Sequence, residues 1–142
     1  MKSDMALLLA EKMRPVIDEY QLKIIRVDGG EALIVSPNYA LRFIFDRDSV
    51  DISYIDRDSR SRLNSYTLRP LFLQRLTPED SARYGYPKEM GSRLLASLCV
   101  YASVLSSKCR DVLGGDKSWL KRDAWLEGNI THSIERLLED EL

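Results

Sequence analysis

Carboxylates crowd one short stretch of the chain, and they are the first residues whose types and spacing could do chemistry. This group comprises Asp46, Asp48, Asp51, Asp56 and Asp58. Clustered aspartates can bind a metal ion or offer a negative surface to a basic partner. Asp46-Arg47-Asp48 is too short for an EF-hand loop and lacks its glycine and terminal glutamate. The pattern is typical of a solvated hairpin, with a partner-facing acidic surface as the functional alternative and a metal site least favoured.

A basic segment follows directly. Residues 57–93 carry a net charge of +4, against −3 for residues 1–56 and −2 for residues 94–142. Opposite charges across an interface speed association and select the partner, so the first arginines of this segment join the aspartates as candidate partner-binding residues. They are Arg57, Arg60 and Arg62.

Arginines interleaved with aromatic rings could also stack on the bases of single-stranded RNA. In this segment, however, Leu68, Leu71 and Phe72 recur at a helical spacing that is typical of a buried stripe. No RNP or KH motif accompanies them. A solvated or protein-facing basic edge is therefore favoured over RNA binding.

Several enzyme classes are excluded by what the sequence lacks. His132 is the only histidine, so neither a two-histidine metal site nor an HExxH motif exists. The sequence has no GxSxG elbow, no GxxxxGK[ST] loop and no GxGxxG. The glycine pairs Gly29-Gly30 and Gly114-Gly115 are typical of turns. We therefore predict no catalytic residue, no metal and no cofactor.

The elements that position these residues begin with an amphipathic helix over residues 4–20, capped by Ser3 or Asp4. Pro15 should bend or divide it, because proline lacks an amide donor. Four strands then follow with short turns between them, which predicts an antiparallel meander. The predicted strands are Leu22–Asp28, Ala32–Ser36, Ala40–Asp46 and Ser49–Asp56. Apolar residues alternate with polar ones along the last two, so we expect helices on one face of the sheet.

Helices account for most of the remaining chain. Residues 57–65 read as an exposed loop, and a central helix is predicted from Pro87 to about Arg110. Shorter helices are expected around Leu68–Leu76, from Thr77 to Gly85, and from Asp116 or Ser118 onward, with Gly128-Asn129 able to split the last one. Leu94, Leu98, Tyr101 and Leu105 should pack on the sheet face that carries Leu41, Phe43, Val50 and Ile52.

Length and charge fit this arrangement. The chain has 142 residues and a net charge of −1, which suits a single α+β domain over residues 1–142. Its longest uncharged stretch, Leu94–Ser107, is shorter than the roughly 20 residues of a spanning helix. Cys99 and Cys109 fall on different helix faces and have the pattern of thiols in a reducing compartment. We expect a cytoplasmic protein.

The first part of the chain resembles a known class. A leucine-rich helix (MALLLAEKMRPVIDEYQLKII) leads into strands ending ALRFIFDRDSVDISYID. This order is similar to small bacterial immunity proteins of polymorphic or contact-dependent toxin systems. The resemblance implies a protein that binds and blocks a toxin domain without catalysis of its own. A homodimeric secretion-type chaperone and a small RNA-binding protein are the alternatives.

Overall fold

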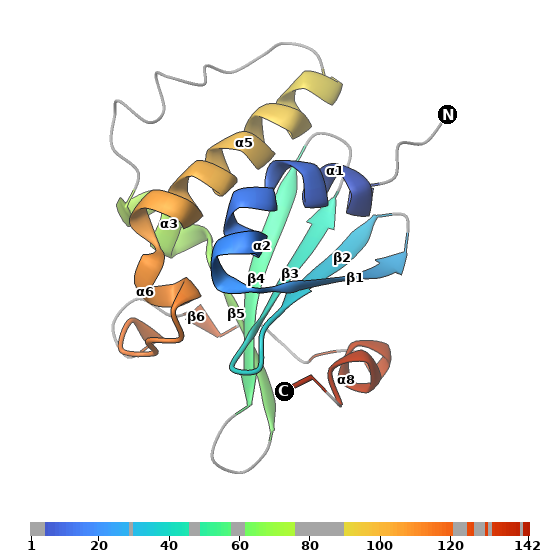
Figure 1. The fold of residues 1–142 in the computed structure, drawn as a ribbon, viewed down its shortest axis with the longest axis vertical. Coiled ribbons are helices and arrows are strands. Elements are labelled where there is room, and N and C mark those ends of the chain that lie inside the picture. The colour runs from blue at the N-terminus through green and yellow to red at the C-terminus, as the bar shows by residue number, and fades with distance from the viewer. Residues whose placement is uncertain are drawn as a thin grey trace.

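The structure, a computed structural model, describes residues 5–28, 30–45, 49–57, 62–75, 90–120, 125–126, 130, 132–139 and 141–142. It is an α+β arrangement in which helices pack on an antiparallel sheet, as predicted (Figure 1). None of the helices in the described ranges is long and apolar enough to cross a bilayer.

The sheet is larger than the four-stranded meander that the sequence predicts. Six strands follow one another in the order β1-β2-β3-β4-β5-β6. They are β1 (Lys23–Asp28), β2 (Glu31–Val35), β3 (Ala40–Phe45), β4 (Val50–Arg57), β5 (Leu63–Thr67) and the two-residue β6 (Trp125–Leu126). The expectation of a loop over residues 57–65 is thus wrong for Arg57, which ends β4, and for residues 63–65, which lie in β5. Leu63 pairs with Arg57 and Tyr66 with Tyr54, because the edge of β4 supplies backbone partners whatever the side-chain pattern of β5.

The first helix is divided where proline predicts. The structure has α1 (Met5–Lys12) and α2 (Arg14–Tyr20) with Met13 between them. The Met13 amide still donates to the Leu9 carbonyl at 2.8 Å, and the Met13 carbonyl accepts from Ile17 at 2.8 Å. Pro15 lies in the first turn of α2, where a missing amide donor costs least.

The later helices differ from the prediction near the C-terminus. They are α3 (Arg69–Arg75), α5 (Met90–Lys108), α6 (Arg110–Leu113) and α8 (His132–Leu138). The helix predicted through Leu126 is wrong at that residue, because Trp125–Leu126 pairs with Tyr66–Thr67 as β6. The helix predicted from Thr77 to Gly85 lies outside the described residues.

One face of the sheet is covered by α1, α2 and α5 (Figure 1). Leu98 and Leu105 of α5 belong to the same buried cluster as Leu41 and Phe43 of β3, as predicted. Val50 and Ile52 of β4 are in this cluster too, Tyr101 packs against it, and the side chain of Leu94 is not described. Pairing of Phe43 with Ile52 places both side chains on one face, so the predicted strand register is confirmed.

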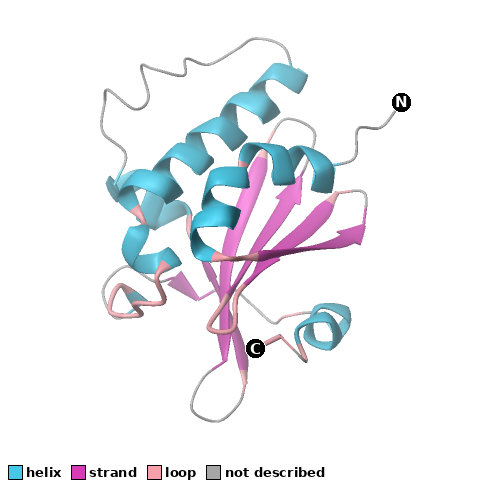
Figure 2. Ribbon diagram, viewed as in Figure 1, coloured by secondary structure: helices cyan, strands magenta, loops and turns pink. Residues whose placement is uncertain are grey.

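The opposite face is covered as well, which the one-sided prediction missed. Ile134 and Leu138 of α8 form a second buried cluster with four strand residues. Those residues are Leu33, Val35, Ala40 and Ile55. Figure 2 shows α8 standing apart from the other helices. Lys23 and Glu141 form an ion pair at 2.8 Å beside this cluster.

We predict that core and surface positions of β3 and β4 differ sharply in their effect on stability. Phe43 is fully buried and Asp51 is exposed on the other face of the sheet. Phe43→Ala should lower the free energy of unfolding by about 3–5 kcal/mol, because it leaves a cavity. Asp51→Ala should change it by less than about 1 kcal/mol. Urea melts of both variants measure this, and equal losses would contradict the register.

Candidate functional site

The predicted acidic surface is divided by the strand that carries it. Asp51 is exposed, whereas Asp56 is only 6% exposed. The two residues are separated by an odd number of positions along β4, so their side chains leave opposite faces. Arg57 is half-buried and Arg62 is exposed. The other predicted partner-binding residues, Asp46, Asp48, Asp58 and Arg60, lie outside the described residues.

Asp56 and Arg57 make contacts inside the molecule. The Lys117 ammonium lies 3.3 Å from Asp56 Oδ2, while Asp56 Oδ1 is buried with no hydrogen-bond partner among the described residues. Arg57 Nε donates to the backbone carbonyl of Leu142 at 3.2 Å. These two residues therefore tie later segments of the chain to β4.

An aromatic cluster lies beside Asp56 on the same face of β4. Tyr54 stacks on Tyr39 at a centroid distance of 5.3 Å and meets Trp119 edge to face at 4.9 Å. The Tyr39 hydroxyl donates to the Leu113 carbonyl at 2.8 Å. Burial raises the pKa of both Tyr39 and Tyr54 above the ordinary tyrosine value. Both hydroxyls are thus protonated at neutral pH, and the cluster packs the segment after α6 onto the sheet.

An apolar hollow opens on the outer side of α3. Thr67, Arg69, Pro70 and Leu73 line it, and its volume is about 490 Å³. Leu73 is 67% exposed and lies beside Pro70 in this hollow. We call this feature the α3 hollow.

The buried side of α3 explains why Leu73 faces outward. Leu68, Leu71 and Phe72 are buried, and Phe72 packs against Tyr101 of α5 at 5.2 Å between centroids. Leu73 follows Phe72 by one residue and is therefore turned by roughly 100° from it around the helix. The buried stripe predicted from the sequence is confirmed for these three residues.

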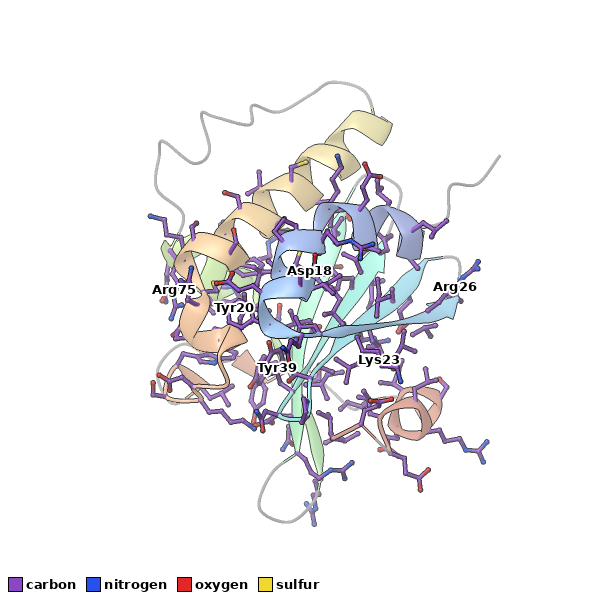
Figure 3. All side chains as sticks on the ribbon, viewed as in Figure 1. Asp18, Tyr20, Lys23, Arg26, Tyr39 and Arg75 are labelled. Carbon is purple, nitrogen blue, oxygen red and sulfur yellow. The ribbon has the colours of Figure 1, made fainter. Side chains whose placement is uncertain are left out.

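A bidentate ion pair fixes the end of α3. Arg75 Nη1 and Nη2 donate to Asp111 Oδ1 and Oδ2 at 2.7 and 3.0 Å, and Nη1 also donates to the Lys108 carbonyl at 2.9 Å. Figure 3 shows Arg75 at the side of the molecule where α3, α5 and α6 meet. The hydrogen bond from Arg75 lowers the pKa of Asp111, and burial raises the pKa of the nearby Cys109 thiol to about 11. Arg75 thus joins α3 to the α5–α6 junction.

The surroundings of the α3 hollow are basic. Residues 67–75, which include the four lining residues, contain Arg69 and Arg75 and no acidic residue. Arg75 is paired with Asp111, whereas Arg69 is exposed on the rim of the hollow. The arrangement suits an apolar group with negative charge beside it.

A metal-binding cluster is not found in the part of the chain that the structure describes. No three His, Cys, Asp or Glu side chains there gather closely enough to hold a metal ion. The side chain of His132 is not described.

Sequence reasoning missed Leu73 because it searched for the buried stripe. The available signal was an apolar residue, within a basic segment, that does not belong to the buried stripe of its helix.

Comparison of the chain with known protein families, with curated proteins and with solved structures finds no match.

We predict that the Arg75–Asp111 pair makes stability depend on pH. Because the folded-state pKa of Asp111 lies below its ordinary value of 3.8, the pair stabilises the fold above that pH. The contribution is lost as the pH falls through the folded-state pKa. The stability gap between wild type and Asp111→Asn should therefore narrow from pH 7 to about pH 3 in urea melts. Asp18→Asn, at an exposed site on α2, is the control, and a constant gap for Asp111→Asn would contradict the prediction.

We also predict that Lys117 compensates the buried charge of Asp56. Lys117→Met leaves that carboxylate buried without a cation and should destabilise the protein by about 1–3 kcal/mol. Adding Asp56→Asn should recover part of the loss, because the uncompensated charge is then removed. Lys108→Met, at an exposed lysine, is the matched control in the same denaturation series. Equal effects of the two lysine variants would contradict the role given to Lys117.

Proposed function

We propose that this chain is a non-enzymatic protein-binding module that neutralises a toxin domain. The α3 hollow is the observation that carries the proposal. Protein interfaces combine an apolar, well-packed centre with a polar or charged rim. Leu73 and Pro70 supply an apolar centre and Arg69 a charged rim, and the resemblance of the first part of the chain to immunity proteins agrees with this use.

Binding is favoured over catalysis by the state of the candidate reactive groups. Burial raises the pKa of the Tyr39 and Tyr54 hydroxyls and of the Cys109 thiol above their ordinary values, which further disfavours their deprotonated, nucleophilic forms. The Asp111 carboxylate accepts both nitrogens of the Arg75 guanidinium. These groups hold elements of the fold together. We therefore assign the function to binding at the exposed surface, where the α3 hollow lies.

Protein is favoured over RNA as the ligand by the positions of the two aromatic rings of the basic segment that the structure describes. Proteins that recognise single-stranded RNA rely on exposed aromatic rings that stack on the bases. Phe72 is 2% exposed and Tyr66 packs against the core, so these rings of the basic segment face inward. The α3 hollow is lined by aliphatic and polar side chains instead.

Neutralisation would work by occlusion. A bound module covers the surface that the toxin domain needs for its substrate, and no bond has to be made or broken. Complementary charges across the contact raise the association rate, which matters when a toxin must be captured before it acts. Asp51 is exposed on the opposite face of the sheet from α3. Within this proposal it remains a candidate residue for a second contact with the partner.

Co-expression tests the proposal. We predict that a toxin domain is encoded beside this gene. Cells that produce that domain should survive when they also produce this chain, and the purified pair should form a stable complex in light scattering. Phe43→Ala, which weakens the fold, should protect poorly. Death of cells that contain the intact chain, together with no complex between the purified proteins, would overturn the proposal.

A further inference from the structure

We infer that the α3 hollow receives one apolar side chain from an acidic segment of the partner protein. This inference rests on the proposed function and names the chemistry of the partner at one place. It is drawn from the shape of the hollow, its rim charge and its attachment to the core.

Exposure and shape define the apolar part of the contact. Leu73 and Leu7 are the two large apolar side chains recorded as exposed in the described ranges, at 67% and 70%. Leu73 lies in the α3 hollow, together with Pro70 and Thr67. The volume of the hollow is about 490 Å³, and it is open to solvent rather than enclosed. A single leucine-sized or phenylalanine-sized group fits such a site.

Charge defines the rest of the contact. Arg75 is already neutralised by Asp111, so Arg69 is the rim charge that the described ion pairs leave for a partner. An acidic residue beside the inserted side chain would pair with it, while a basic residue would be repelled. The same charge argues against a second copy of this chain, because a two-fold contact through the hollow would place both Arg69 side chains in one small interface.

The contacts of α3 with the core hold the α3 hollow in its shape before a partner binds. Leu71 and Phe72 anchor α3 from below, and Arg75 holds its last turn to Asp111 and the Lys108 carbonyl. A partner that binds a preformed surface loses less free energy to ordering of side chains and loops. The hollow can therefore bind short segments measurably, without the rest of the partner.

Two defined peptides test this inference. The acidic probe is Asp-Glu-Leu-Phe-Glu-Asp and the basic probe is Lys-Arg-Leu-Phe-Arg-Lys, each carrying a fluorophore for anisotropy. The acidic probe should bind about tenfold more tightly than the basic one, and the difference should shrink between about 0.05 and about 0.5 M NaCl. Backbone amide shifts in NMR spectra should locate the acidic probe at residues 67–75.

Matched variants separate the apolar contribution from the charge. Leu73→Ala should weaken the acidic probe about tenfold, whereas Leu7→Ala, at an equally exposed leucine, should leave it unchanged. Arg69→Glu should reverse the preference toward the basic probe, and Arg14→Glu, at an exposed arginine of α2, should not. Equal binding of both probes, equal effects of the two alanine variants, or preferential binding of a uridine oligonucleotide at residues 67–75 would overturn the inference.

Failure of this inference is distinguishable from failure of the proposed function. If the wild-type chain and Leu73→Ala protect cells equally well, the hollow is not the contact and the protective function stands. If the wild-type chain does not protect but binds the acidic probe through Leu73, the toxin proposal fails and the chemistry of the hollow stands.

Discussion

Burial of β2 on both of its faces is the constraint on which the rest of the fold depends. Ala32, Leu33, Ile34 and Val35 are each at most 2% exposed. Successive side chains of a strand leave opposite faces, so this run needs apolar cover on two sides at once. Ala32 and Ile34 belong to the cluster under α1, α2 and α5, whereas Leu33 and Val35 belong to the cluster under α8. Helices from the N-terminal part of the chain (α1 and α2) and from its C-terminal part (α8) therefore cover the two faces of one sheet.

The same constraint explains how much of the fold the sequence could predict. Alternation in β3 and β4 predicts a sheet with one apolar face, and the helix α5 that covers this face is recognised by its period. The continuous run in β2 is the mark of a strand buried on both faces, and a reading based on β3 and β4 passes over it. β5 shows no alternation, since Asn64, Ser65 and Thr67 are polar, and its place is determined by pairing with β4. Such pairing depends on the backbone of the neighbouring strand, which the propensity of the β5 residues alone does not contain.

Candidate site residues were harder to predict for a related reason. Aspartates that are neighbours in the sequence are separated when a strand alternates, as Asp51 and Asp56 show. Asp56 is buried and forms an ion pair with Lys117 inside the protein. The exposure of Leu73 follows from how α3 packs on the rest of the protein. A sequence pattern identifies only the stripe of residues that a helix buries.

A single segment links the candidate site to the centre of the sheet. Residues 108–119 supply the Lys108 carbonyl and Asp111 that hold Arg75, and also the Leu113 carbonyl and Trp119 that contact Tyr39 and Tyr54. The α3 hollow is thus joined to β4 through two sets of contacts made by the same short stretch. A surface held in this way keeps its shape in the free protein, so binding there gains from every contact with little loss to ordering. This rigidity agrees with the proposed use of the chain as a protein-binding module.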